Sequence, residues 1–183
     1  MFTSSSQTDK VQFYAESVGQ IEVKLKGDGQ IEMNFPNHLP VHLNIIPTDL
    51  IDGLSIPPKE VLINEQAYFV IYDRYQDVLE VKQYPEWIKK LGPRDVVVTA
   101  KADNEEFDFV SRYFWPATGG DEDPVTGSAH TGLAPYWSKQ LNKDKLIAYQ
   151  ASERGGVLYC SIKGDRVLIS GYVVPYLVGQ ITI

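Results

Sequence analysis

Near the start of the chain, apolar and polar residues alternate in the way that predicts half-buried antiparallel strands. Gly27-Asp28-Gly29 supplies a tight turn before the last of these runs. Residues 1–10 are mostly polar, and we expect them to be loosely ordered. Residues 36–47 contain three prolines, so they are predicted to form an extended linker. The three alternating runs are Val11–Glu16, Ile21–Leu25 and Gln30–Phe35.

From residue 48 onward, the pattern changes to short helices between more deeply buried strands. We expect a helix at Asp49–Leu54, with Thr48 as its N-cap. A second helix is expected at Pro85–Leu91, with Gly92 at its end. Ala67–Tyr72 is a continuous apolar run, which is typical of a buried strand. The strands predicted in this part are Glu60–Ile63, Ala67–Tyr72, Asp95–Lys101, Phe107–Trp115, Lys145–Gln150, Gly156–Ile162, Arg166–Ser170 and Val173–Ile183.

One stretch joins a flexible acidic loop to an apolar helix. The loop, residues 119–125, reads Gly-Gly-Asp-Glu-Asp-Pro-Val, and the helix is predicted to begin with Thr-Gly-Ser at residues 126–128. The two glycines allow the chain to turn, Pro124 suits a helix start, and Thr126 or Ser128 can cap the first N–H groups. The residues that follow are too apolar for a surface helix, so we expect this helix to be buried.

The start of this helix is the main candidate site of the chain. Its unpaired N–H groups and the positive end of its dipole favour an anion, and the small residues Gly127 and Ser128 leave room for a carboxylate to approach the backbone. The alternative is an ordinary loop in which Asp123 and Ser128 serve only as capping groups. His130 lies within one helical turn of the site, and it either contacts the ligand or faces the core.

Segments around this stretch resemble the signature of the PhzF (phenazine biosynthesis-like) family. They are Phe107–Phe114, Glu122–His130 and Ser152–Gly156. The resemblance covers nearly the whole chain from about residue 11. It implies an α+β, diaminopimelate epimerase-like fold, in which two similar domains each wrap a mixed sheet around one central helix. It also implies an active site that lies between the domains and needs no cofactor.

The resemblance implies a division of this chain into one complete domain and part of another. Residues 48–171 would form the complete second domain, residues 1–47 part of the first domain with a linker, and residues 172–183 a strand that returns to the first. The partial domain would expose an apolar face without a covering helix, so we expect a homodimer or a complementing subunit. That face comprises Val11, Phe13, Ile21, Val23, Leu25, Ile31, Met33 and Phe35.

The matching motif also implies roles for single residues. Asp123 would hydrogen-bond a polar substituent of the substrate, and Ser128 stands where racemases of this fold have a catalytic Cys, so these two are the candidate catalytic residues. Gly127 and the Ser128 N–H would hold the substrate carboxylate, with His130 as a further candidate binding residue. Because a helix N-terminus stabilises a nearby carboxylate as the anion, Asp123 is better suited to accept hydrogen bonds than to donate a proton.

Family members also carry an Asn-Leu-Ser-Glu motif and a Cys-Gly-His-Ala-Thr motif, and neither occurs in these 183 residues. The Glu of the first motif is the proton carrier of the family. The resemblance therefore implies a cofactor-independent isomerase that moves a proton between carbons of a small carboxylic acid, with its general acid–base supplied by another polypeptide. Two alternatives stay open: a non-catalytic protein that binds a small anion, and a structural remnant or scaffold that is stable only as an oligomer.

Composition and charge argue against several classes of protein. The formal net charge is −7 and the basic residues are scattered, which argues against a nucleic-acid-binding surface. No apolar run approaches the roughly 20 residues that span a bilayer. The first residues lack the pattern of a signal peptide, so we expect a cytoplasmic protein.

Other residues with reactive side chains have structural explanations. The single Cys160 lies in a strand-like run and is predicted to be a small buried hydrophobe. His38 and His42 lie among prolines, which disfavour the helix that metal binding at this spacing would need, so no metal is expected. Arg112 and Arg154 are candidate partners for a ligand carboxylate, although an arginine on a strand more often forms a structural ion pair.

Overall fold

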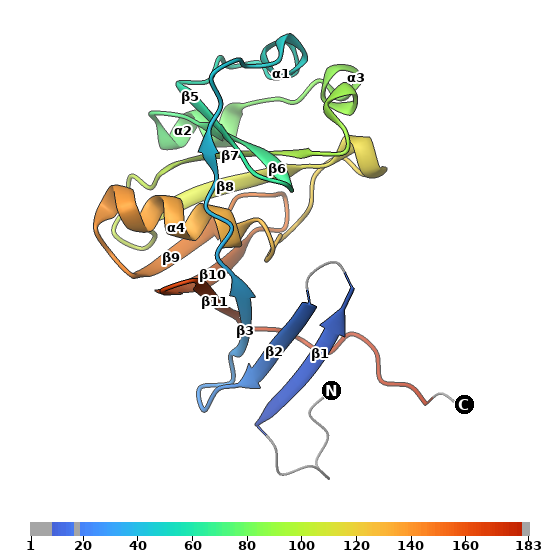
Figure 1. Ribbon diagram of the computed structural model, residues 1–183, viewed down its shortest axis with the longest axis vertical. Helices are drawn as coiled ribbons and strands as arrows, with labels where there is room; N and C mark the ends of the chain where they lie inside the picture. The colour runs from blue at the N-terminus through green and yellow to red at the C-terminus, as the bar shows by residue number, and fades with distance from the viewer. Residues whose placement is uncertain (1–8, 17–18, 181–183) are drawn as a thin grey trace.

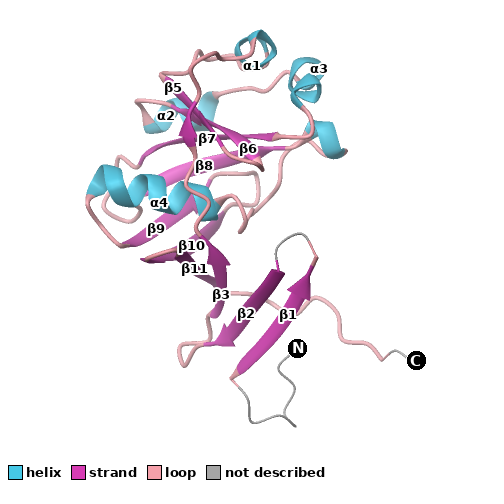
Figure 2. Ribbon diagram, viewed as in Figure 1, coloured by secondary structure: helices cyan, strands magenta, loops and turns pink. Residues whose placement is uncertain are grey.

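The computed structural model describes residues 9–16 and 19–180, which form one mixed sheet bent around a central helix (Figures 1 and 2). The strand order is β1-β2-β3-β11-β10-β9-β8-β7-β6-β5-β4. Neighbouring strands are antiparallel except for the pairs β6–β7 and β8–β9. The strands are β1 (Lys10–Ala15), β2 (Gly19–Leu25), β3 (Ile31–Pro36), β4 (Val41–His42), β5 (Glu60–Ile63), β6 (Ala67–Ile71), β7 (Asp95–Lys101), β8 (Phe109–Phe114), β9 (Lys145–Gln150), β10 (Gly156–Lys163) and β11 (Arg166–Gly171).

Helices cover both faces of the part of the sheet that contains β5 to β8. On β7, Val96 and Val98 pack with residues of the short helices, whereas Val97 packs with residues of the long helix α4. This alternation is what a strand buried on both faces requires. The helices are α1 (Thr48–Asp52), α2 (Tyr75–Glu80), α3 (Pro85–Ile88), the 3₁₀ turns η1 (Lys89–Leu91) and η2 (Pro116–Thr118), and α4 (His130–Leu141).

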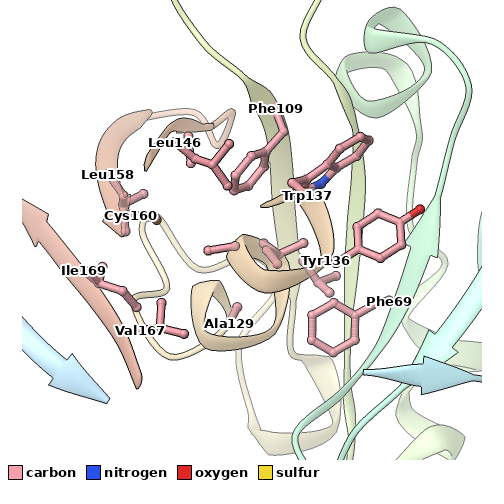
Figure 3. Close-up of a cluster of buried hydrophobic side chains, with 14 of the residues drawn as sticks. Phe69, Phe109, Ala129, Tyr136, Trp137, Leu146, Leu158, Cys160, Val167 and Ile169 are labelled. Atoms are coloured by element: carbon pink, nitrogen blue, oxygen red, sulfur yellow. The ribbon is translucent and has the colours of Figure 1, made fainter. Parts of the chain in front are cut away.

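The main core surrounds α4, as Figure 3 shows. Helix and sheet approach closely at Gly132, where an added Cβ would lie 2.6 Å from the ring of Phe69. Pro135 lies inside the helix and cannot donate to the carbonyl of Thr131. The N–H of His38 in the linker donates to that carbonyl instead (3.1 Å), so the linker completes the hydrogen bonding of the helix.

The structure confirms most predicted elements and corrects others. Glu60–Ile63, Asp95–Lys101 and Lys145–Gln150 form the predicted strands. Thr48 is not an N-cap, because it lies inside α1 after Pro47. Helix α2 was not predicted, since its six residues are too few to show a clear helical period. Part of the predicted loose segment, residues 1–8, lies outside the described residues.

The predicted strand Val173–Ile183 is wrong over residues 173–180, which form no strand, and residues 181–183 lie outside the described residues. Strand β11 is already paired on both edges, with β10 on one side and β3 on the other, and the chain leaves the sheet after Gly171. The exposed fraction of Leu177 is 74% and that of Val178 is 80%, so the apolar pattern here has no sheet surface to cover it. The segment ends on the same side of the molecule as the β1–β2 hairpin (Figure 1).

The apolar face predicted on the first strands is continuous with the face of the sheet that contacts α4. Val23 pairs with Val11 and Met33, and Met33 pairs with Ile169 of β11, so these side chains share one face. Phe35, Met33 and Ile21 reach the core around α4. Farther along this apolar face the side chains are open to solvent: the exposed fraction of Phe13 is 49% and that of Leu25 is 36%.

Candidate active site

The acidic loop turns sharply after η2 and returns to the edge of β8. Gly119 has φ of 111°, which residues with side chains rarely adopt, and a Cβ on Gly120 would lie 2.1 Å from the indole of Trp115. The N–H of Asp123 then donates to the carbonyl of Tyr113 (3.0 Å). Both predicted turn glycines are therefore needed, and they place Asp123 beside β8.

A glutamine from β9 fixes the last residues of the loop. Gln150 is 1% exposed, and its Oε1 accepts the N–H of Thr126 (2.8 Å). Its Nε2 donates to the carbonyl of Asp123 (2.7 Å) and to Oγ1 of Thr126 (3.2 Å). The Thr126 hydroxyl donates in turn to the carboxylate of Asp123. One buried side chain thus sets the backbone conformation immediately before the helix.

The chain enters α4 through a tight turn over residues 127–129, and the predicted capping by Thr126 or Ser128 is wrong. Helix α4 begins at His130, and no side chain caps its first residue. The carbonyls of Gly127, Ser128 and Ala129 accept hydrogen bonds from the helix. In the described part of the chain, the N–H groups of the same three residues have no acceptor. Ser128 is exposed, so its N–H and hydroxyl are available to an anion.

A series of hydrogen-bonded side chains at the ends of β6, β7 and β8 leads to Ser128. Gln66, just before β6, donates from Nε2 to the Ser128 hydroxyl (2.8 Å) and to the Tyr113 hydroxyl (3.0 Å). Tyr113 donates to Oδ2 of Asp95 (2.8 Å). Burial, and secondly the hydrogen bond to Asp95, raise the pKa of Tyr113 well above its usual range. Burial also raises the pKa of Asp95, an effect that the hydrogen bond from Tyr113 opposes.

Two hollows meet at Gln66 and Ser128. The larger, of about 580 Å³, is lined by the apolar side chains of Phe35, Leu39, Val41 and Ile63 together with polar residues. The smaller, of about 250 Å³, is polar and is lined by Asp95, Tyr113, Trp115, Asp123, Thr126 and the two shared residues. The structure therefore brings Asp123 and Ser128 to one hollow, as their predicted roles require.

Gly127 faces another hollow, of about 280 Å³, on the side of β3 and β11. An added Cβ at Gly127 would meet only the methyl group of Met33, at 3.7 Å. Arg154 is exposed and lines the same hollow, so it is placed to meet an anion that approaches Gly127. Gly127 and Arg154 thus line a hollow other than the one that contains Asp123 and Ser128.

His130 faces the core and does not line either of the hollows at Ser128. It is completely buried, and Nδ1 donates to the carbonyl of Thr126 (2.8 Å). Nε2 has no partner in the described part of the chain. Burial lowers the pKa of His130 to about 4, although the hydrogen bond to Thr126 opposes this shift. Of the two alternatives for this residue, the structure favours the packed, neutral histidine over the ligand contact.

Arg112 has a structural role. Its guanidinium forms a bidentate ion pair with Glu122 (2.8 and 2.9 Å), and Nη1 donates to the carbonyl of Val81 (2.8 Å) after α2. These contacts join the acidic loop, β8 and the end of α2. Because its donors are already engaged, Arg112 is not available as a partner for a ligand carboxylate.

Cys160 is buried, and burial raises the pKa of its thiol to about 12, as fits a small hydrophobe rather than a nucleophile. His42 lies on β4 with Nε2 at 3.3 Å from Glu60, and no group of three possible metal ligands occurs in residues 9–16 and 19–180. Over the same ranges, every helix is too short or too polar to span a bilayer.

The sequence and the solved structures of known proteins agree on the family. The family model described as phenazine biosynthesis-like protein, PhzC-PhzF, matches residues 2–179. The chain belongs to the PhzF family. This chain is similar to a PhzC/PhzF protein from Clostridium difficile, with a TM-score of 0.83 and 35% identity over 98% of this chain and 68% of that one. The diaminopimelate epimerase-like fold expected from the resemblance is confirmed.

Relatives named as isomerases cover most of this PhzF-family chain. A protein named uncharacterized isomerase from Halalkalibacterium halodurans is 41% identical over 172 residues, which make up 94% of this chain and 64% of the relative. Another protein of that description, from Pseudomonas aeruginosa, is 40% identical over 92% of this chain and 63% of its own length. The chain therefore spans less than two thirds of the curated relatives that it matches.

Sequence reasoning missed Gln66, Gln150, Tyr113 and Asp95. Each lies at or near the end of a strand, and nothing in the local pattern distinguishes them from ordinary strand residues. Gln66 contacts Ser128 across 62 positions and Gln150 contacts Thr126 across 24. The one available signal was the polar Gln150 at the end of a predicted buried strand, because a buried amide requires partners.

Proposed function

We propose that this chain supplies the anion-binding part of a PhzF-type isomerase, which moves a proton between two carbons of a small carboxylic acid without a cofactor. The observation that carries the proposal is the group of free N–H donors before α4, beside an exposed hydroxyl and a hollow lined by Asp123. Free backbone donors at a helix start bind carboxylates well. The names of the relatives support the reaction class.

In this proposal, Gly127 and Ser128 bind the carboxylate and Asp123 accepts a hydrogen bond from a polar substituent. The Asp123 carboxylate already accepts the Thr126 hydroxyl, and it retains a second oxygen for the ligand. Arg154 adds positive charge at the Gly127 side. These contacts would hold the substrate in a fixed orientation, which is a large part of the catalytic effect in proton transfer.

We further propose that the general acid–base comes from polypeptide outside these 183 residues. A base must lie within roughly 3 Å of the proton that it moves. The carboxyl groups at the smaller hollow each already accept one hydrogen bond, Asp123 from Thr126 and Asp95 from Tyr113, and His130 is buried with a pKa of about 4. The apolar face near Phe13 and Leu25 is a surface on which such a polypeptide, or a second copy of this chain, would pack.

The test is incorporation of deuterium from heavy water into β,γ-unsaturated and hydroxy-amino acids, followed by NMR. We expect no exchange with the chain alone, and exchange when the remaining third of the Halalkalibacterium halodurans relative is added as a separate polypeptide. Gly127→Val should abolish the restored exchange by blocking the approach to the backbone, at a position where an added Cβ makes only an ordinary contact with Met33, at 3.7 Å. Rapid exchange by the chain alone, lost in Asp123→Asn, would instead assign the proton transfer to Asp123.

A non-catalytic anion-binding or scaffold protein remains the alternative function. It would bind carboxylates at the helix start and show no exchange with the added polypeptide. Binding without turnover would therefore refute the isomerase while leaving the anion site in place.

A further inference from the structure

The Ser128 hydroxyl stands at the end of a hydrogen-bonded chain that begins at the first residue of the inner strand β7. The chain runs from Asp95 at the start of β7 to Tyr113 on β8, then to Gln66 before β6 and finally to Ser128. Its three contacts measure 2.8, 3.0 and 2.8 Å. Tyr113 lies in the Phe107–Phe114 segment that resembles the family signature, whereas Asp95 and Gln66 lie outside the segments of that signature.

The direction of each hydrogen bond follows from the chemistry of the groups. The Tyr113 hydroxyl donates to Oδ2 of Asp95, so the Tyr113 oxygen is left to accept. The group that faces this oxygen must be a donor, which places the amide nitrogen of Gln66, rather than its oxygen, toward Tyr113. The second N–H of the same nitrogen then points to the Ser128 oxygen.

The consequence is an oriented hydroxyl at the candidate site. Because Ser128 accepts from Gln66, its own proton must point away from Gln66. In the described part of the chain, the Ser128 hydroxyl donates to no other group. Ser128 is exposed where the two hollows meet. Its proton is therefore available to an acceptor in the hollows.

The neighbours of Gln66 hold this arrangement in place. Its backbone N–H donates to Oδ1 of Asn64 (2.9 Å), and its carbonyl accepts the N–H of Asp95 (3.1 Å). Tyr113 is buried, and its raised pKa keeps the phenol protonated. The backbone of Gln66 is thus held by Asn64 and Asp95, and its side-chain amide is held by the Tyr113 hydroxyl.

We propose that Gln66 is a positioning residue of the anion site, which turns the proton of the Ser128 hydroxyl toward the ligand. At the helix start the ligand then meets donors from the free N–H groups and from Ser128, whereas Asp123 in the smaller hollow is an acceptor. This set of donors selects an acceptor such as a carboxylate oxygen, over an amine or amide N–H, at the position beside Ser128. This inference rests on the proposed function only in requiring that an anion occupy the helix start.

The substitution Gln66→Glu tests the direction of the bond with little change of shape. When ionised, the introduced carboxylate accepts the Ser128 proton and turns it away from the ligand. When protonated, it regains a donor. Sulfate is the probe, because it keeps its charge between about pH 5 and pH 8, and the NMR shifts of the Gly127 and Ser128 amides report its binding. Gln140→Glu, at an exposed position on α4, is the control for the added charge.

We expect Gln66→Glu to bind sulfate about tenfold more weakly than wild type at about pH 8, which corresponds to the loss of one hydrogen bond to a charged group. The ratio of the two affinities should return toward one at about pH 5. Gln66→Met, which has no donor and no charge, should be weak at both pH values, and Gln140→Glu should match wild type.

Two outcomes would overturn the inference alone: wild-type affinity of Gln66→Glu at about pH 8, or a loss that acid does not reverse in a folded protein. If wild-type protein gives no sulfate-dependent shift at Gly127 and Ser128, the anion site itself is refuted, and the inference fails with it. The failure of the positioning role is thereby distinguished from the failure of the proposed function.

Discussion

Replacing Gln150 by leucine tests whether one buried amide holds the acidic loop in place. Leucine is similar in volume, so the change removes hydrogen bonds without opening a large cavity. The Thr126 N–H and the Asp123 carbonyl would lose the partner that the structure gives them, while the Thr126 hydroxyl would keep its bond to Asp123. Each unpaired buried backbone group costs about 1–3 kcal/mol, and two groups lose their partner. Because water can reach Asp123 and reduce the cost there, we expect the free energy of unfolding to fall by about 2–4 kcal/mol in total.

Urea unfolding followed by circular dichroism measures this loss. With a typical urea m-value, Gln150→Leu should lower the midpoint by roughly 1–2 M. The exposed control Gln140→Leu should change stability by at most about 0.5 kcal/mol. The amide signals of Gly127 and Ser128 should also shift in Gln150→Leu, because the loop before them loses its anchor. An unchanged midpoint together with unchanged amide signals would refute the assigned role.

The other predictions concern pH and assembly. The buried His130 has a pKa of about 4 in the folded protein and about 6.5 when unfolded, so its contribution is fully present above pH 6.5 and is lost as the pH falls toward 4. Wild type should therefore lose about 2–3 kcal/mol more than His130→Asn between about pH 7.5 and pH 4.5 in urea unfolding, and equal losses would contradict the assigned burial of a neutral imidazole. For assembly, the exposed Phe13 and Leu25 predict self-association or binding of a complementing subunit, weakened by Phe13→Glu. A monomer by sedimentation at micromolar concentration that binds no hydrophobic dye would disprove this.

The sequence by itself determined the elements whose burial follows from a local period. The strands Glu60–Ile63 and Asp95–Lys101, and the burial of α4, were predicted from patterns that span a few residues. The turn at Gly119 was predictable for the same reason, because glycine permits a backbone that other residues avoid. The family motif then directed attention to Asp123 and Ser128, which the structure places in one hollow.

Only the tertiary structure decided which groups meet that motif. It turned His130 into the core, engaged Arg112 with Glu122 and the end of α2, and brought Gln66 and Gln150 to the two sides of the helix start. Hydrophobic periodicity is a property of neighbouring residues, whereas a hydrogen-bond partner is set by the register between strands that are distant in sequence. A glutamine at the end of a strand has the same local pattern whether it faces water or orients a serine, and the packing of the sheet around α4 makes the difference.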